Sequence, residues 1–270
     1  MKILKFGGTS VGSAERMKSL YDIAKRNNRQ IIVLSAVSGT TNALVSIGEA
    51  FQQGRKEDAD QQIKTLRKTY DLYLEELFST EEGLRNGTEL VDYHFKLINS
   101  FNGKLYTPIE DKIILAQGEL LSTTLFHFYL NEQGIKSALL PALDFMKIDD
   151  DNEPVIDHIR TNLNALLEKE PDCNLFITQG FICRNSFGEI DNLRRGGSDY
   201  TASLIGSAIQ AEEIQIWTDI DGMHNNDPRL VSGTKPIAHL SFNEAAELAY
   251  FGAKILHPQS VFLRSDTTFL

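Results

Sequence analysis

The stretch Ile3-Leu4-Lys5-Phe6, followed at once by Gly7-Gly8-Thr9-Ser10, decides the fold class of this 270-residue chain. The first four residues are typical of a short buried strand, and the paired glycines predict a tight turn after it. Ser13 can then cap a helix whose apolar residues share one face. Because a second, continuously apolar run follows at residues 31–34, this segment predicts a parallel sheet covered on both faces.

Residues 42–133 have a helical pattern throughout. Apolar residues recur there at three- and four-residue steps, as in Ile63, Leu66 and Tyr70. Thr107-Pro108-Ile109-Glu110 has the form of a capping box with proline at the first helical position. This pattern predicts a helical subdomain beside the sheet.

Sheet-type segments return after this helical block. Strands are expected at residues 137–140, 174–178 and 214–217, the last of them buried, and a hairpin at 181–183 and 190–193. Ser198 is expected to cap a helix that runs to Gln210. Ser241-Phe242-Asn243-Glu244 has the form of a second capping box, opening a helix toward Phe251.

The overall charge argues against large polyanionic partners. The chain has 27 basic and 37 acidic residues, a formal net charge of −10, which opposes binding to nucleic acids or anionic membranes. No apolar run reaches the roughly 18 residues of a membrane span, and no signal-peptide pattern opens the chain. The two cysteines, Cys173 and Cys183, form no metal-binding or redox motif. We therefore expect a cytoplasmic protein with reduced thiols.

Four glycine- or hydroxyl-rich turns in the sequence predict a site for a small anionic ligand. Lys5 precedes the first glycine turn, and a loop of hydroxyl side chains follows at residues 35–42. Arg194-Arg195-Gly196-Gly197-Ser198-Asp199 opens a helix, and an aspartate-rich loop at residues 217–222 ends a strand. Backbone amides at such turns and helix starts favour phosphate groups. Neither a Walker A motif nor a G-x-G-x-x-G motif is present. The combination of amides and cations is what phosphoryl transfer needs.

A second interpretation overlaps the first turn. Gly8-Thr9-Ser10-Val11-Gly12 satisfies G-x-S-x-G, the nucleophile elbow of α/β-hydrolases. Ser10 would then be the nucleophile of a serine hydrolase. Its partners would be drawn from the downstream residues Asp219 or Asp227 and His239 or His257. The short pattern lies on the first strand, whereas an elbow normally follows several strands, so this alternative is the weaker one.

Seven collinear motifs make the chain similar to a known family. Over residues 1–262 it resembles the aspartokinases in the order and spacing of these motifs. They are Lys5-Phe6-Gly7-Gly8-Thr9-Ser10, Gln117-Gly118-Glu119, Gln179-Gly180-Phe181, Arg195-Gly196-Gly197-Ser198-Asp199, Trp217-Thr218-Asp219, Asp227-Pro228-Arg229 and Phe251-Gly252-Ala253-Lys254-Ile255-Leu256-His257-Pro258.

The resemblance implies both a fold and a reaction. The fold is an amino-acid-kinase-like α/β/α sandwich with three layers, a mostly parallel central sheet and a helical subdomain. The reaction is phosphorylation of the side-chain carboxylate of L-aspartate by ATP with Mg²⁺, the first step toward lysine, threonine and methionine. Alternatives are a related enzyme acting on another acceptor (glutamate, N-acetylglutamate, carbamate or UMP) and a sensor that binds ATP without turnover.

The resemblance also implies roles for individual residues. Lys5 and Asp199 would be catalytic, and Mg²⁺ would be held mainly through the nucleotide phosphates rather than by a protein metal site. The phosphate-binding residues would be Gly7, Gly8 and Ser10. The aspartate site would comprise Thr41, Glu119, Phe181, Arg195 and Ser198. The ATP contacts would be Lys5, Thr218, Asp219, His224, Arg229 and Lys254.

The chain departs from the family pattern in three places. Arg194 stands where the family usually has glycine, and His224 stands where a tyrosine usually lies near the nucleotide. Aspartokinases normally continue into paired ACT regulatory domains, which we expect to be absent from this chain, and residues 263–270 fit the family poorly. We expect a homo-oligomer in the full-length protein.

Overall fold

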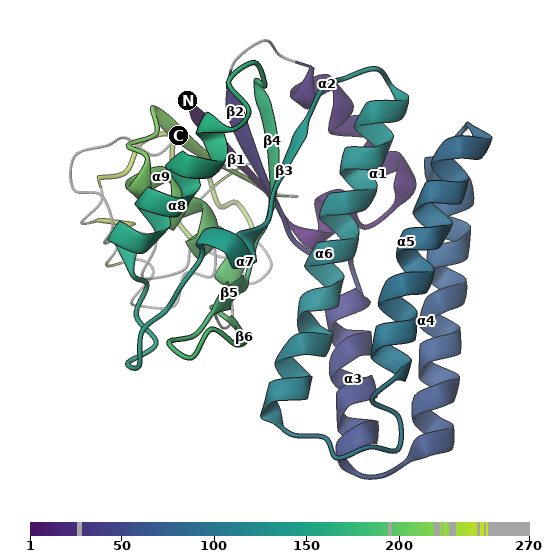
Figure 1. The fold of residues 1–270 in the computed structure, drawn as a ribbon. Coiled ribbons are helices and arrows are strands. Elements are labelled where there is room, and N and C mark those ends of the chain that lie inside the picture. The colour runs from purple at the N-terminus through teal and green to yellow at the C-terminus, as the bar shows by residue number, and fades with distance from the viewer. Residues whose placement is uncertain are drawn as a thin grey trace.

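A parallel sheet lies at the centre of the molecule (Figure 1). The computed structural model describes residues 1–25, 29–193, 196–218, 222, 224–226, 231–241, 244, 245 and 247. Within them, five strands pair in the order β3-β4-β2-β1-β7, and every neighbouring pair is parallel. The expected parallel sheet is confirmed. Its strands are β1 (Lys2–Phe6), β2 (Gln30–Leu34), β3 (Ala138–Leu140), β4 (Leu175–Gln179) and β7 (Glu213–Trp217).

The register aligns the carboxyl ends of four strands. Phe6 pairs with Leu34 on one side and with Trp217 on the other, and Leu34 pairs with Gln179. The turns that follow β1, β2, β4 and β7 therefore leave the sheet at one edge. The chain passes from β1 to β2 on one side, while β7 lies on the other, and ligands collect at such a switch of direction in open α/β sheets.

Successive strand residues serve two separate cores, because side chains alternate across a sheet. Leu4, Ile32 and Ile177 belong to the core beneath α1 (Ala14–Ser19), α2 (Tyr21–Ala24) and the long helices. Ile3 and Phe176 belong to the core on the opposite face. The sheet is thus the middle of three layers, as the resemblance implied.

Four long helices form the larger side of the molecule (Figure 1). They are α3 (Thr40–Gln52), α4 (Lys56–Leu77), α5 (Glu81–Asn99) and α6 (Pro108–Glu132). The other side contains α7 (Ala142–Phe145), α8 (Ile156–Glu168) and α9 (Gly197–Ala208), with the antiparallel hairpin of β5 (Ile182–Arg184) and β6 (Ile190–Asn192). A short 3₁₀ helix, η1 (Gly8–Val11), follows β1.

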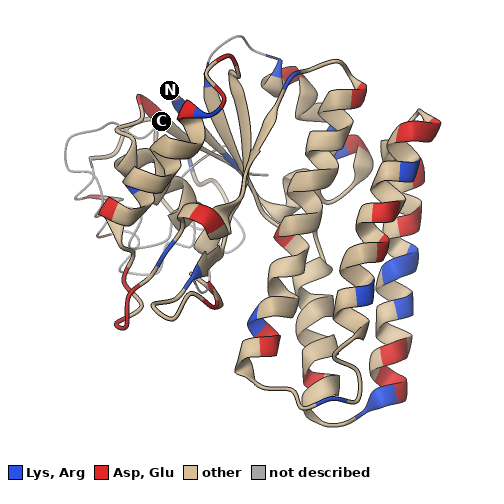
Figure 2. Ribbon diagram, in the orientation of Figure 1, with Lys and Arg blue, Asp and Glu red and all other residues tan. Residues whose placement is uncertain are grey.

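Helix α6 connects the helical block to the sheet, since it packs against α3 and α5 as well as β2, β3 and β4. Its sequence reflects this position: between Lys112 and Glu132 its only Asp, Glu, Lys or Arg side chain is Glu119. Figure 2 shows many more charged residues on the outer helices α4 and α5. A helix covered on both sides must be apolar all round, so the buried Glu119 needs a separate explanation.

The helix starts were predicted with mixed success. Ser13 accepts a hydrogen bond from the Arg16 amide, and Thr107 and Glu110 form the expected capping box. The prediction that Ser198 caps a helix was wrong. The cap of α9 is Gly196, which has a left-handed backbone (φ 77°) that glycine adopts readily and makes no side-chain cap bond, and Ser198 lies within the first turn. Ser241 and Glu244 make the contacts of the second capping box, but Phe251 lies outside the described residues.

Strand β7 is less buried than the sequence predicts. It lies at the edge of the described sheet, and Trp217 at its end is 36% exposed, with its ring stacked on Phe6 at 5.6 Å between centroids.

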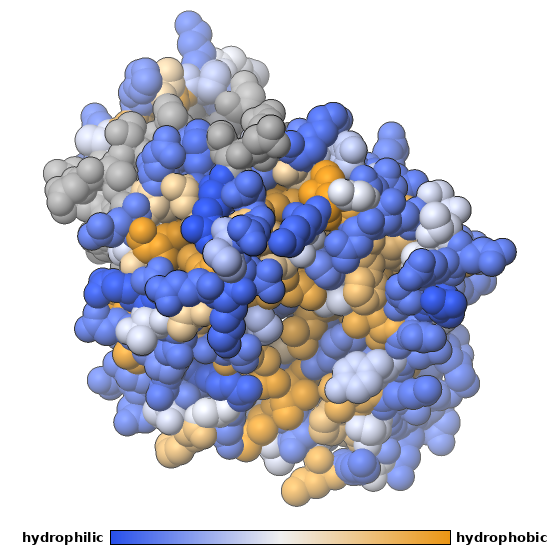
Figure 3. Space-filling view, turned by 45° about the horizontal axis from the view of Figure 1, so that its top comes forward, coloured by the Kyte–Doolittle hydropathy of each residue, from blue (hydrophilic) through white to orange (hydrophobic). Residues whose placement is uncertain are grey.

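Figure 3 shows a surface that is largely hydrophilic, with hydrophobic residues gathered toward the middle of that face. No described helix is long and apolar enough to span a membrane.

Tyr73 links the helical block to the first glycine turn. It lies buried on α4, and its hydroxyl donates a 2.9 Å hydrogen bond to the carbonyl of Val11. We expect Tyr73→Phe to lower the free energy of unfolding by about 1–3 kcal/mol, because a buried carbonyl loses its partner. Tyr93→Phe, at a side chain that is 66% exposed, should change it by less than about 0.5 kcal/mol. Urea denaturation of both variants measures this, and equal effects would contradict the assignment.

Candidate active site

A cavity of about 470 Å³ opens beyond the carboxyl ends of β1, β2 and β4. It joins parts of the chain that are far apart in sequence, because the strand register brings their turns to one edge. Its lining residues are Lys5, Gly8, Thr9, Ser35, Ala36, Val37, Ser38, Gly39, Thr41, Glu119, Phe181, Gly196, Gly197, Ser198 and Asp199.

An ion pair crosses this cavity. Lys5 Nζ, from β1, lies 2.5 Å from Asp199 Oδ1, in the first turn of α9, and both side chains are largely shielded from solvent. Partial burial makes such a pair stronger than an exposed one. The pair holds the Lys5 ammonium inside the cavity, where it can meet an anionic group.

Two helices begin at the cavity wall. Gly39 precedes α3 and Gly196 precedes α9, and residues of both first turns line the cavity. The free amides and the dipole at a helix N-terminus favour negative charge. With Lys5, they give the cavity an anion-binding side.

The first two turns lie in close contact. A Cβ atom placed on Gly8 would stand 3.0 Å from the carbonyl oxygen of Ala36. Glycine therefore lets the turn after β1 approach the turn after β2, and this approach brings Lys5 and Glu119 into one cavity.

Phe181 has a strained backbone at the cavity wall. Its φ of 66° lies in the left-handed region, which few residues other than glycine adopt. Two hydrogen bonds fix it: its amide donates to Thr201 Oγ1 at 3.0 Å, and its carbonyl accepts from the Leu193 amide at 2.8 Å. Strain of this kind clusters at functional sites.

Glu119 places a buried carboxyl group in the lining of the cavity. The residue is only 3% exposed. Its Oε1 atom accepts a 3.2 Å hydrogen bond from the Ala36 amide, whereas Oε2 has no hydrogen-bond partner among the described residues. Burial raises the pKa of Glu119 to about 8, although the bond from Ala36 opposes the rise. A cationic group bound beside Oε2 would favour the carboxylate form.

The structure brings most of the expected site residues together and leaves others apart. Lys5, Gly8 and Asp199 line the cavity, as do the aspartate-site residues Thr41, Glu119, Phe181 and Ser198. Gly7 lies beside Lys5, since a Cβ on it would stand 3.5 Å from Nζ. Ser10, Thr218 and His224 do not line this cavity. Arg195, Asp219, Arg229 and Lys254 lie outside the described residues.

Sequence reasoning assigned no role to two supporting residues, one of which, Gln179, stands in one of the seven motifs. Thr201 holds Phe181, as described above. Gln179 accepts a 2.8 Å bond from the Ala142 amide and donates one of 2.8 Å to Thr123. Both are buried polar residues. The signal for Gln179 was its position at a strand end, beside Gly180 and Phe181.

The hydrolase interpretation gains no support. An elbow serine sits on a strained strand-to-helix turn, whereas Ser10 lies in η1 and is not among the described residues with positive φ. No described histidine is bonded to it; Asp219, Asp227 and His257 lie outside the described residues. Among the residues that are described, no group of three or more His, Cys, Asp or Glu side chains could hold a metal ion.

A comparison with known protein families shows to which family the chain belongs. The profile of the Amino acid kinase family matches residues 1–264. This chain belongs to the amino acid kinase family. It is 35% identical to lysine-sensitive aspartokinase 3 of Escherichia coli, over 98% of this chain and 59% of that protein. It is 34% identical to the chloroplastic aspartokinase 1 of Arabidopsis thaliana, over 96% of this chain and 47% of that protein.

Solved structures agree with this membership. E. coli aspartokinase III in complex with aspartate and ADP superposes with a TM-score of 0.86 at 33% identity, covering 97% of this chain and 59% of that one. An isopentenyl phosphate kinase, at 14% identity and a TM-score of 0.52, shares the fold. The chain thus spans about half to three fifths of the length of the aspartokinases it matches.

The buried Glu119 predicts a pH-dependent loss of stability. Its pKa rises from 4.5 to about 8 on folding, so between these values the native state keeps a proton that the unfolded chain releases. Stability from this group therefore falls as the pH rises, by up to about 1.4 kcal/mol per pH unit. We expect Glu119→Gln to gain stability relative to the parent chain between pH 5 and 8. Denaturant titration of both chains across that window measures the difference, and a difference that does not vary with pH would refute it.

Proposed function

We propose that this chain is the catalytic part of an aspartate kinase. It transfers the terminal phosphoryl group of ATP to the side-chain carboxylate of L-aspartate and produces 4-phospho-L-aspartate and ADP. The observation that carries the proposal is a single cavity lined by both a buried carboxyl group, Glu119 on α6, and a lysine, Lys5 on β1. The similarity to aspartokinase III, solved with aspartate and ADP, supports the same assignment.

The acceptor is recognised by opposite charges at its two ends. Glu119 binds the ammonium group of aspartate through Oε2, which has no described partner. Arg195 pairs with a carboxylate of the substrate, for which the planar guanidinium is suited. Thr41, Phe181 and Ser198 line the space between.

The phosphoryl group is transferred between two negatively charged reactants. A carboxylate oxygen of aspartate attacks the terminal phosphorus, and the bond to the bridging oxygen of ADP breaks. The attacking oxygen is already ionised, so no strong general base is needed. Lys5, with the amides of Gly7 and Gly8, stabilises the charge on the transferring group, and Asp199 orients the Lys5 ammonium. Ser10, beside these glycines, completes the proposed phosphate-binding turn.

The nucleotide is bound next to this turn. We assign Thr218, Asp219, His224, Arg229 and Lys254 to ATP. Mg²⁺ bound with ATP would neutralise phosphate charge. The cavity carboxylate Asp199 is already paired with Lys5, so the metal would be held mainly through the phosphates.

The proposal extends to the cellular setting. The enzyme serves amino-acid biosynthesis toward lysine, threonine and methionine. The buried free thiols of Cys173 and Cys183 support a reducing compartment such as the cytoplasm. The full-length protein acts as a homo-oligomer, and size-exclusion chromatography with light scattering tests that part.

Substrate-dependent ADP release tests the proposal. We expect release with L-aspartate and none with L-glutamate or UMP. Succinate, which is aspartate without its ammonium group, should be a poor substrate of the parent chain. Glu119→Gln should raise the KM for L-aspartate by roughly 10- to 100-fold, the effect of losing a charged hydrogen bond, and should reduce the preference over succinate. Turnover of a different acceptor alone would overturn the assignment.

Lys5 tests the phosphoryl-transfer role. We expect Lys5→Ala to lower kcat by roughly 10²–10³-fold, the loss typical of one transition-state donor. Lys2→Ala is the matched control on the same strand, where Lys2 pairs with Glu213 away from the cavity. Steady-state kinetics of both variants decide the matter, and an unchanged kcat in Lys5→Ala would exclude the role.

A further inference from the structure

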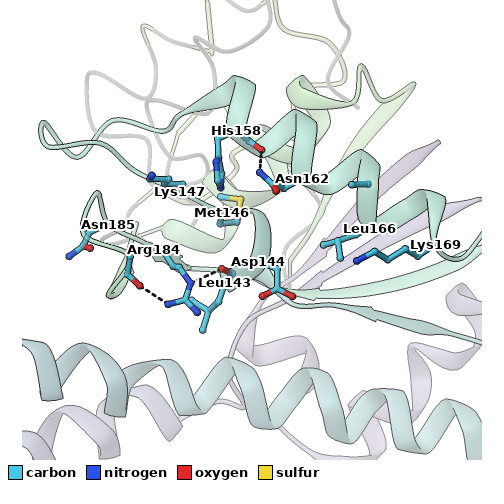
Figure 4. Close-up of a pocket in the computed structure, with 12 residues that line it drawn as sticks. Leu143, Asp144, Met146, Lys147, His158, Asn162, Leu166, Lys169, Arg184 and Asn185 are labelled. Atoms are coloured by element: carbon cyan, nitrogen blue, oxygen red, sulfur yellow. Dashed lines mark hydrogen bonds between the residues drawn. The ribbon is translucent and has the colours of Figure 1, made fainter.

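A second cavity, of about 480 Å³, lies on the side of the sheet that α7 and α8 cover. It is enclosed by α7, α8 and the β5–β6 hairpin (Figure 4) and shares no lining residue with the candidate active site. Its lining residues are Leu143, Asp144, Met146, Lys147, His158, Asn162, Ala165, Leu166, Lys169, Arg184, Asn185 and Gly188.

The cavity is basic in a chain of net charge −10. Lys147, Lys169 and Arg184 line it, against the single carboxylate of Asp144. Within the described parts of the chain, none of the three cations has an acidic partner at ion-pair distance. The nearby Asp157 pairs instead with Arg160, which does not line the cavity. An excess of positive charge is therefore left for a ligand.

Arg184 is held in place without being neutralised. Its Nε donates to the Leu143 carbonyl at 2.9 Å, and its Nη1 donates to the Gly188 carbonyl at 2.6 Å. Figure 4 shows these bonds, with Lys147 and Lys169 toward opposite ends of the cavity. Carbonyl groups fix the guanidinium but carry no net charge, so further N–H donors remain for an anion. A fixed donor loses less conformational entropy when it binds.

The remaining lining provides a neutral polar group and an apolar floor. His158 points into the cavity (Figure 4), and burial and the charge of Lys147 both lower its pKa. Both effects favour the neutral imidazole. Leu143, Met146 and Leu166 supply the apolar part. A ligand that carries both an anionic and an apolar portion matches this lining.

We propose that this cavity binds a small organic anion. A carboxylate or phosphate group of the ligand contacts Arg184 within the field of Lys147 and Lys169, and its apolar portion packs on Leu143 and Leu166. The site is independent of the proposed kinase activity, because it shares no residue with the other cavity and its occupancy is measured by binding alone.

The site also adjoins the wall of the candidate active site through the backbone. Arg184 ends β5, which begins directly after the strained Phe181. The amide of Arg184 donates to the Met146 carbonyl at 2.9 Å, which ties this strand to the floor of the basic cavity. A ligand on Arg184 therefore contacts the strand that begins directly after Phe181.

NMR of the histidine side chains tests the proposal in the whole chain. The His158 signal is assigned by its loss in His158→Gln. We expect saturable shifts of this signal on titration with inorganic phosphate and with 3-methylbutanoate, at constant ionic strength maintained with sodium chloride. Tighter binding of 3-methylbutanoate identifies an apolar carboxylate as the ligand class, and tighter binding of phosphate identifies a phosphate compound.

Two double lysine variants test whether the anion binds in this cavity. Lys147→Gln combined with Lys169→Gln should weaken binding at least about tenfold, or about 1.4 kcal/mol, and both side chains can change without breaking a described hydrogen bond. Lys96→Gln combined with Lys136→Gln removes the same charge at exposed positions outside the cavity and should leave binding unchanged. Absence of saturable shifts, or equal losses in the two double variants, overturns the proposal.

Discussion

The burial of one carboxyl group in an apolar helix constrains the whole candidate site. Helix α6 lies between the sheet and the outer helices, and Glu119 is the only Asp, Glu, Lys or Arg residue in its central part. An isolated buried charge is costly, so Glu119 favours its protonated form when no ligand is bound. The Ala36 amide, which donates to Glu119, fixes the turn after β2 against α6. A cationic ligand would compensate the charge of the Glu119 carboxylate. Because that charge is costly when it is uncompensated, the site favours ligands that carry an ammonium group.

The second part of the site depends on strand register. Phe6, Leu34 and Gln179 end their strands in one row, so three turns from distant parts of the sequence meet at one edge. Lys5 reaches across this edge to Asp199 on α9. The hydrogen bonds between these strands therefore position both the anion-binding side and the carboxylate side of the cavity. Small shifts of β1 would disturb both at once.

Much of the fold could be predicted because local patterns agree with it. The apolar runs predicted β1 and β2, and Thr107 with Glu110 marked the start of α6. The order of the strands could not be predicted, because periodicity says nothing about which strands pair. Gly196 was missed as a helix cap because it acts through its backbone rather than a side chain. The left-handed Phe181 was missed for a related reason, since tertiary contacts to Thr201 and Leu193 impose it.

The topology of the sheet also bears on how the chain folds during synthesis. Helices α3 to α6 contact mainly their neighbours in sequence and can form early. The central strands must wait, because Ile31 pairs with Phe176 and Ile3 pairs with Ile214. Until β7 emerges from the ribosome, β1 presents an unpaired edge to other chains. The nascent protein is thus most exposed to aggregation after helices α3 to α6 have formed and before β7 has emerged.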